Sequence, residues 1–264
     1  MISIAMGYKN RKDLLLRSLE SFRKSSVKNY EVVIVDDASN EDQRLEDILE
    51  TYPEIKLTRI EASDRYWNNP CMPYNIAFDK CSNKIILIQN PECFHHGDVL
   101  SVALANTNRS NYVLFPVYAL NKDQTYFQFD DISNLSQSDL FNHLPNVPWG
   151  GHEGDSGWYN HAVYNRRGLH FCSAIHKGSL KELRGFDERF AEGYSFEDDE
   201  FIHRITMNGY KIQYVDAPVV FHQWHYSSHI TNDPKFVELF TQNGRLLHKI
   251  KSRQIPMWGS YENI

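Results

Sequence analysis

The feature that most restricts the fold of this chain is a set of short, continuous apolar runs separated by helical patterns. Glu31–Asp36 reads EVVIVD and Lys84–Gln89 reads KIILIQ. Neither run alternates apolar with polar residues, so both are typical of parallel strands buried on both faces. Apolar residues at helical spacing in Asp13–Lys24 and Val99–Asn106 predict helices that can cover these strands. The sequence therefore predicts an α/β fold with a doubly wound, mostly parallel central sheet flanked by helices.

Further patterns complete this organisation. The other predicted strands are apolar or β-branched runs, namely Ile2–Met6, Ile55–Ile60, Tyr112–Tyr118, His170–His176, Lys211–Val215 and Pro218–His222. The other predicted helices have apolar residues at helical spacing, namely Glu41–Thr51, Pro73–Lys80, Asp198–Asn208 and Phe236–Lys251. Leu144–His161 is rich in glycine and tryptophan, which is typical of a loop that closes over a ligand.

Composition excludes several classes of partner. The formal net charge is −6 and no long basic run is present, which argues against a nucleic acid held through its phosphates. No apolar stretch approaches the roughly 20 residues that span a bilayer. The opening run Met1–Met6 is apolar but too short for a signal peptide. The four cysteines have no Cys-x-x-Cys spacing, as expected of free thiols. Together these observations predict a cytoplasmic protein.

Polar residues follow three of the predicted parallel strands. They are Gly7-Tyr8, Asp36-Asp37 and Gln89-Asn90-Pro91-Glu92. Parallel strands end at one edge of the sheet, where ligands bind in α/β folds, so these residues predict a binding crevice. Asp36 and Asp37 could bond a nucleotide base and ribose, although aspartates in this position also start turns and cap helices.

Two groups of residues could hold a cation or a phosphate. Glu92 supplies the carboxylate oxygen that Mg²⁺ and Mn²⁺ prefer. Asn90 could bond ribose or phosphate, but a turn begun by Asn-Pro explains it equally well. His222 and His225 follow the last strand, where a neutral imidazole could complete a Mn²⁺ shell or have only a structural role. Arg65 could offset diphosphate charge, or it could be an ordinary surface residue.

The run Glu197-Asp198-Asp199-Glu200 places four carboxylates in one helical turn. Their repulsion would raise the pKa of at least one of them, and one carboxylate could then accept a proton from a hydroxyl as general base. The alternative is a solvated acidic turn, with Glu200 and Arg204 as a surface ion pair. The glycines and aromatics that precede the run, at Gly185-Phe186 and Gly193–Phe196, favour a site.

Taken together, these motifs resemble the family 2 glycosyltransferases of the GT-A fold, over roughly Ile2 to His222. Ser3-Ile4 with Tyr8 and Arg11 is similar to the family's opening Ser-Ile-x-x-x-Thr-Tyr-Asn-Arg. Val33–Ser39 resembles its Val-Asp-Asp-Gly-Ser strand end. Gly185–Phe190 followed by Glu197-Asp198-Asp199 resembles its Gly-Phe-Asp-Glu-x-Phe and Glu-Asp motifs, and also the Gly-Gly-Glu-Asp-Asp-Asp region of β-1,4-galactosyltransferases.

The resemblance implies a function and a division of the chain. An inverting enzyme would move a sugar from a nucleoside diphosphate sugar, most often a UDP-sugar, to a hydroxyl of a carbohydrate or glycoconjugate. Residues 1–264 would form one GT-A domain. Residues 1–118 would bind the nucleotide sugar, residues 119–232 would bind the acceptor and catalyse transfer, and residues 233–264 would form a C-terminal helix and tail.

The resemblance also implies roles for single residues. Asp198 would be the general base. The acceptor contacts would be Glu197 and Asp199, and the nucleotide contacts Asp37, Asp36 and Tyr8. The residues themselves add Trp158, from the tryptophan-rich loop, as an acceptor contact, and Arg65, Asn75 and Asn90 as nucleotide contacts. A divalent cation, Mn²⁺ or Mg²⁺, would be held by Glu92 and His222.

The chain departs from the family pattern at the expected Asp-x-Asp metal motif, which aligns with Gln89-Asn90-Pro91. Pro91 occupies the usual place of the metal-binding Asp, and Glu92 lies one residue later. This leaves a non-catalytic sugar- or nucleotide-binding relative as an alternative, although retention of Glu197-Asp198-Asp199 argues against it. A nucleotidyltransferase would need a glycine-rich phosphate loop after the first strand, and Gly7–Arg11 has a single glycine.

Overall fold

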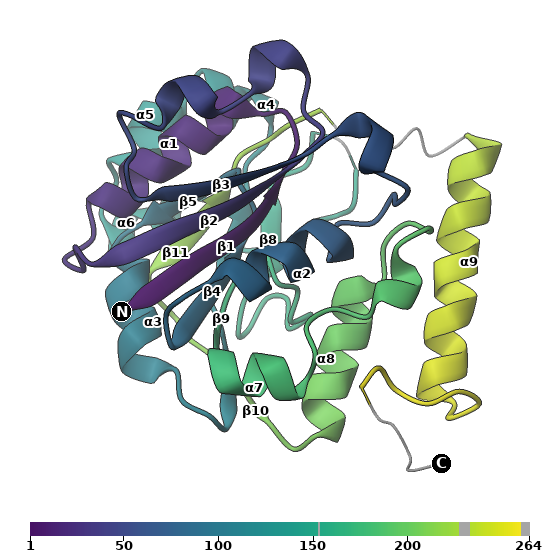
Figure 1. The fold of residues 1–264 in the computed structure, drawn as a ribbon. Helices are drawn as coiled ribbons and strands as arrows, with labels where there is room; N and C mark the ends of the chain where they lie inside the picture. Colours follow the sequence, from purple (N-terminus) through teal and green to yellow (C-terminus); the bar gives the residue numbers. More distant parts are fainter. Residues whose placement is uncertain (153, 227–232, 260–264) are drawn as a thin grey trace.

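The computed structural model describes residues 1–152, 154–226 and 233–259. Its centre is a seven-stranded sheet in the order β10-β6-β9-β4-β1-β2-β3 (Figure 1). The strands are, in chain order, β1 (Ile2–Tyr8), β2 (Tyr30–Asp37), β3 (Ile55–Ile60), β4 (Ile85–Gln89), β6 (Asn111–Leu114), β9 (Cys172–His176) and β10 (Lys211–Tyr214). Only β9 runs antiparallel to its neighbours, β4 and β6. The predicted mixed, mostly parallel α/β sheet is thus confirmed.

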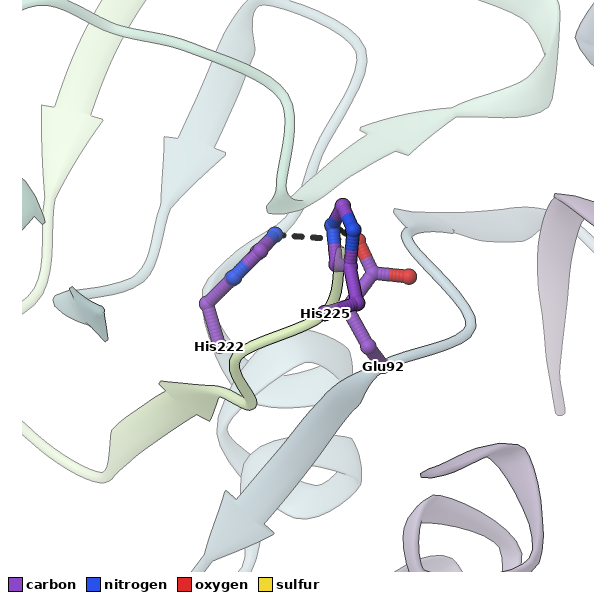
Figure 2. A group of neighbouring side chains, drawn as sticks. All are labelled: Glu92, His222 and His225. Carbon is purple, nitrogen blue, oxygen red and sulfur yellow. Dashed lines mark ion pairs between the residues drawn. The ribbon is translucent and has the colours of Figure 1, made fainter. Parts of the chain in front are cut away.

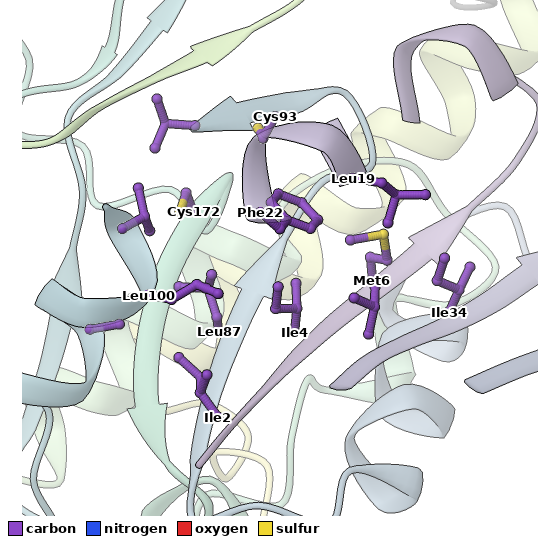
Figure 3. Packing of buried hydrophobic residues seen from close by; sticks show 14 of the residues in the cluster. Ile2, Ile4, Met6, Leu19, Phe22, Ile34, Leu87, Cys93, Leu100 and Cys172 are labelled. Carbon is purple, nitrogen blue, oxygen red and sulfur yellow. The ribbon is translucent and has the colours of Figure 1, made fainter. Parts of the chain in front are cut away.

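Helices cover both faces of this sheet (Figure 1). On one face α1 (Lys12–Arg23) and α3 (Val99–Asn106) cover strand side chains such as Ile4 and Met6, which share a core with Phe22 of α1 (Figure 3). The other face packs against α2 (Cys71–Lys80), α7 (Lys177–Glu182) and α8 (Glu197–Met207). Strand residues alternate between these two cores, because successive side chains on a strand point to opposite faces. Burial on both sides explains why the strands are apolar throughout.

A second sheet of four strands lies beside the first, in the order β5-β11-β7-β8. Its strands are β5 (Cys93–His96), β7 (Val117–Ala119), β8 (Gly157–Asn160) and β11 (Val219–His222). Three short helices, α4 (Lys122–Tyr126), α5 (Phe129–Ser133) and α6 (Gln137–His143), follow β7. A separate apolar core joins α5 and α6 to this sheet. The sequence did not predict β5, β8, α7 or these three helices.

The last helix is α9 (Pro234–Lys251), which stands at one side of the molecule next to α8 (Figure 1). It packs Leu247 and Ile250 against Phe190 in a small core of its own. The predicted boundary after residue 232 lies outside the described residues, as does the end of the tail beyond residue 259. The division of the chain at residue 118 stays a prediction. No helix in the described part of the chain combines the length and apolar character needed to cross a membrane.

Two predicted elements differ from the structure. The predicted helix Glu41–Thr51 is two separate 3-10 turns, Glu41–Gln43 and Glu46–Ile48. The carbonyl of Gln43 accepts the Tyr8 hydroxyl at 2.7 Å, so it is not available to continue a helix. The predicted strand Tyr112–Tyr118 is divided between β6 and β7, which belong to different sheets. Pro116 lies at the division, and proline has no N–H for a strand ladder.

Candidate active site

A strained turn precedes the acidic run. Ser195 and Phe196 have φ angles of 60° and 73°, a left-handed conformation that is uncommon outside glycine. Two amide side chains hold the turn from either side, because Asn69 and Asn243 donate to the Ser195 carbonyl at 3.3 Å and 3.0 Å. Helix α8 begins at Glu197. Strain of this kind persists where the surroundings over-determine the backbone, often at functional sites.

The three acids that open α8 occupy a crowded, partly buried environment. Glu197 is 6% exposed, and its carboxylate accepts a hydrogen bond from Asn69 at 2.7 Å. Burial, and next the charge of Asp198, raise the pKa of Glu197 well above its ordinary value. The same two causes raise the pKa of Asp199. The Asp198 side chain is 20% exposed and its Oδ2 lies 3.5 Å from Nδ1 of His170. Asp198, partly exposed like Asp199, therefore lies between two carboxylates whose pKa values are raised.

The fourth acid has a structural role. The Glu200 carboxylate pairs with Arg204 at 2.7 Å, and the side chains are 0% and 1% exposed. Arg204 also donates to the carbonyls of Leu183 and Gly185. The predicted pair is thus present, but it is buried and not on the surface. It ties α8 to the end of α7 and fixes the direction in which the acidic turn points.

A second cluster lies at the end of β4 and contains Glu92, His222 and His225, whose side chains point toward one another (Figure 2). Nε2 of His222 is 2.9 Å and Nε2 of His225 is 3.6 Å from Oε1 of Glu92. On its other oxygen Glu92 accepts a hydrogen bond from Arg11 at 3.0 Å. Burial alone would raise the pKa of Glu92, but Arg11 and the histidines together hold it well below its ordinary range.

This cluster fits a divalent cation. One ligand atom from each of Glu92, His222 and His225 lies within 4.8 Å of the other two. Burial lowers the pKa of His222, although Glu92 acts to raise it, so the imidazole is neutral and its nitrogen can be a ligand. Of these three residues only His225 was not among the predicted ligands. The sequence did contain a sign of this third ligand, because His225 follows His222 by three residues in FHQWHY.

The two clusters are joined through a short path of contacts. Asn90 donates to Glu92 at 3.1 Å and accepts the Tyr74 hydroxyl at 2.8 Å. The Tyr74 ring lies edge-on to the ring of His170, with centroids 5.2 Å apart. The next residue, Phe171, lies edge-on to His222 at 5.2 Å. His170 and Phe171 therefore lie between the acidic turn and the Glu92 cluster. No spacing in the sequence indicates this arrangement.

The residues predicted to hold a nucleotide have different surroundings. Asp37 is 7% exposed and accepts hydrogen bonds from Arg65 at 3.0 Å and from the Trp67 indole at 2.8 Å. Arg65 thus lies beside the proposed base-binding carboxylate. Asn90 stays among the predicted contacts because it lies between the two clusters.

Tyr8 and Asp36 require a correction. Both are completely buried. The Tyr8 hydroxyl donates to Gln43, and the Asp36 carboxylate accepts from the Ser39 N–H at 2.9 Å and pairs with Arg59 at 3.0 Å. Because their polar atoms face inward, these residues support the strand end and do not present a surface to a ligand.

Trp158 also requires a correction. Trp158 is 0% exposed and packs against Tyr118 and Phe141 in the core of the second sheet. It has no free face for a sugar.

Asn75 joins α2 to the segment before the acidic turn. Its amide exchanges hydrogen bonds with the backbone N–H and C=O of Phe186, at 2.8 and 2.9 Å. The side chain is partly exposed, and its role as a nucleotide contact stays a prediction.

Comparison with known proteins agrees with this arrangement. A model of the family described as glycosyl transferase family 2 matches residues 3–168. The chain belongs to glycosyl transferase family 2. The matched region contains the strand ends at Asp37 and Glu92, and ends before the acidic turn. No curated protein matches the chain.

Solved structures share the GT-A fold with this family member. S. aureus TarS in complex with UDP-GlcNAc is 17% identical, with a TM-score of 0.63, over 93% of this chain and 65% of that one. Mannosyltransferase PcManGT from Pyrobaculum calidifontis, in complex with GDP-Man and Mn²⁺, is 15% identical, with a TM-score of 0.58, over 97% and 64%. GalNAc-T7 with UDP, GalNAc and Mn²⁺ is 15% identical, with a TM-score of 0.58, over 89% and 45%. The chain thus spans less than two thirds of these structures.

Proposed function

We propose that this protein transfers a sugar from a UDP-linked donor to a hydroxyl of a glycan or other acceptor, with inversion at the anomeric carbon. The single observation that carries the proposal is the short path from Glu92 through Asn90, Tyr74 and His170 to Asp198. This path supports the proposal because it connects residues that could bind a cation with residues that could take up a proton. A displacement reaction needs these two functions on opposite sides of one reacting carbon.

Asp198 is the proposed general base. As the acceptor oxygen bonds to the anomeric carbon, the hydroxyl proton passes to the Asp198 carboxylate and the bond to the diphosphate breaks. One displacement of this kind inverts the configuration. Glu197 and Asp199 have raised pKa values caused first by burial, so they suit hydrogen bonding to other acceptor hydroxyls more than proton removal. Proton transfer of this type contributes typically 10²–10⁴-fold in rate.

The leaving diphosphate needs positive charge. Glu92, His222 and His225 would hold a divalent cation, which when bound would offset the charge of the diphosphate. Two imidazoles beside one carboxylate favour Mn²⁺ over Mg²⁺, which prefers oxygen ligands. PcManGT and GalNAc-T7 are described with Mn²⁺. Arg11, at 34% side-chain exposure beside Glu92, can donate to phosphate oxygens from the same side.

The nucleotide is proposed to bind at the ends of β1 and β2. Asp37, oriented by Arg65 and Trp67, is the proposed contact to the base. Two of the three neighbours are described with UDP or UDP-GlcNAc, and the third with GDP-Man, which supports uridine as the first base to test.

A panel of UDP-, GDP- and dTDP-sugars, with and without Mn²⁺, tests the proposal. Thermal unfolding should show that a UDP-sugar raises the unfolding temperature, and more so with Mn²⁺, because a ligand that binds the native state stabilises it. The stabilising donor is then incubated with a panel of glycans and release of UDP is measured. Stabilisation without acceptor-dependent release would indicate the non-catalytic binding relative. No stabilisation by any sugar nucleotide would refute donor binding.

A further inference from the structure

We propose that His170 is a positioning residue for Asp198: its Nδ1–H holds one oxygen of the Asp198 carboxylate and leaves the other oxygen for the acceptor hydroxyl. This inference rests on the proposed role of Asp198 as general base. It adds a residue that belongs to neither predicted cluster and that no motif in the sequence identifies.

The polar atoms of His170 carry the argument. The residue is 6% exposed. Among the described residues, its Nδ1 is buried and has no hydrogen-bond partner, while Oδ2 of Asp198 lies 3.5 Å away. A buried N–H group is unfavourable unless it finds an acceptor. Catalytic hydrogen bonds are often long without substrate and shorten when substrate binds. The Nδ1 atom thus lies close to the proposed base and is free to bond it after a small movement.

The ring of His170 is held in this direction by aromatic packing. It lies edge-on to Tyr74 with centroids 5.2 Å apart, and tilted against Phe186 at 4.8 Å. Burial lowers the pKa of His170, although Asp198 acts to raise it, so the ring is neutral at neutral pH and carries one N–H. Glu197 and Asp199 lie beside Asp198 on its own helix, and Tyr74 and Tyr112 also feel its charge. The cations Arg167 and Lys251 act on Asp199, and within the described residues the ion pair of Asp198 is with His170.

A second arrangement would use the same atoms. Ligand atoms of His170, Glu197 and Asp198 lie within 4.8 Å of one another, close enough to surround a cation. A cation bound to the Asp198 carboxylate would weaken its attraction for the acceptor proton, because positive charge favours the ionised form. The raised pKa of Glu197, caused first by burial, also favours a neutral carboxyl, which is a weak ligand. A hydrogen-bonded pair is the arrangement that leaves Asp198 able to act.

Two variants of similar size distinguish these arrangements. In His170→Asn the side-chain amide nitrogen can lie where Nδ1 lies, whereas in His170→Gln it reaches the position of Nε2. We expect His170→Asn to keep kcat within about threefold of the wild type. We expect His170→Gln to lower kcat by about 10- to 100-fold, the loss typical of residues that orient a catalytic group, with KM for the UDP-sugar unchanged. Equal kcat values in the two variants would overturn the positioning role.

Further measurements separate the positioning role of His170 from the proposed role of Asp198 as general base. Asp198→Asn is assayed beside the His170 variants. Normal turnover by Asp198→Asn would overturn the role of Asp198 as general base. If Asp198→Asn is inactive but His170→Gln is fully active, only the positioning role of His170 is overturned. Titration with Mn²⁺ alone should give the same number of bound ions in His170→Gln and the wild type, and loss of one ion would overturn the proposal. If His170→Gln does not fold, His170→Ala with added imidazole replaces it, and failure of imidazole to restore kcat would be contrary evidence.

Discussion

Two buried glutamates in this molecule have opposite electrostatic surroundings. Glu92 is 0% exposed, and Arg11, His222 and His225 pair with its carboxylate. These partners hold its pKa well below the ordinary value, against the effect of burial. Glu197 is 6% exposed and receives one neutral amide, that of Asn69, so burial and the charge of Asp198 raise its pKa well above the ordinary value. The residue type is the same and the burial is similar. The partners differ.

Opposite electrostatic surroundings allow two glutamates of one protein to serve two kinds of chemistry. A glutamate that stays ionised is suited to hold a positive ion. A glutamate that resists ionisation is suited to donate a hydrogen bond or to accept one from a sugar hydroxyl. Environments that separate the pKa values of neighbouring acids are typical of sites that divide acid and base roles. The Asp198 side chain is 20% exposed, more than either glutamate.

The largest expected effect tests the acidic turn that opens α8. Asp198→Asn should lower kcat by about 10²–10⁴-fold, because the amide cannot accept the hydroxyl proton. Steady-state UDP release with the active donor and acceptor measures it, and calorimetric titration should give unchanged donor affinity. Asp199→Asn is the matched control on the same turn and should affect KM for the acceptor more than kcat. If Asp199→Asn were the more damaging to kcat, the base would be assigned to the wrong aspartate.

The next effect concerns Glu200, a further buried glutamate, whose partner Arg204 is also buried. Arg204→Met leaves Glu200 buried without its partner, and removing one member of a buried pair destabilises by about 3–5 kcal/mol. Urea unfolding followed by circular dichroism measures this loss. Arg109→Met breaks the exposed pair with Glu182 and should change the unfolding free energy far less. Similar losses in the two variants would mean that burial does not distinguish these pairs.

The cation side of the comparison is tested by Glu92→Gln. The variant keeps the size of the side chain but removes the charge, so Mn²⁺ binding should weaken at least about 10-fold, since carboxylate charge is the main attraction for a hard ion. Titration with Mn²⁺ alone, followed by calorimetry, measures the affinity. Glu41→Gln, at an exposed position in the first 3-10 turn, is the control. Unchanged affinity in Glu92→Gln would remove Glu92 from the ligand set.

Much of the fold could be predicted because burial on both faces leaves an unambiguous pattern. The strands at Glu31–Asp36 and Lys84–Gln89 have nearly the predicted bounds in the structure. The helix expected at Glu41–Thr51 failed because a tertiary hydrogen bond to Tyr8 uses a carbonyl that local propensity cannot account for. The strand β5 was missed because its run, Cys93–His96, contains two histidines, which do not signal a buried strand.

The site was predictable where its residues follow one another and less so where the fold brings them together. The acidic run and the pair His222 and His225 are visible as clusters in the sequence. His170 is distant from Asp198 along the chain, and only the antiparallel strand β9 brings them together. Trp158 was misread because a tryptophan in a glycine-rich segment resembles an exposed platform, whereas here it fills the core of the second sheet. Local composition gives no account of that packing.

The smallest expected effect tests the electrostatic contrast directly, through stability. A raised pKa means that native Glu197 binds its proton more tightly than the unfolded chain does. The stability from the neutral carboxyl is therefore present below the ordinary glutamate pKa of about 4.3, and is lost as pH rises toward the raised native value. Glu197→Gln stays neutral at every pH. Its advantage over the wild type in urea unfolding should be near zero at pH 4 and grow to the order of 1 kcal/mol above pH 6.

Glu92 provides a contrast to this last test, because its lowered pKa gives its contribution to stability the opposite dependence on pH. Asp198→Asn should reduce the advantage of Glu197→Gln, since the charge of Asp198 is the second cause of the raised pKa of Glu197. An advantage that grew as the pH fell would mean that Glu197 is stabilised as an anion. The contrast between the two glutamates would then be lost, and Glu197 would need a positive partner that the described residues do not supply.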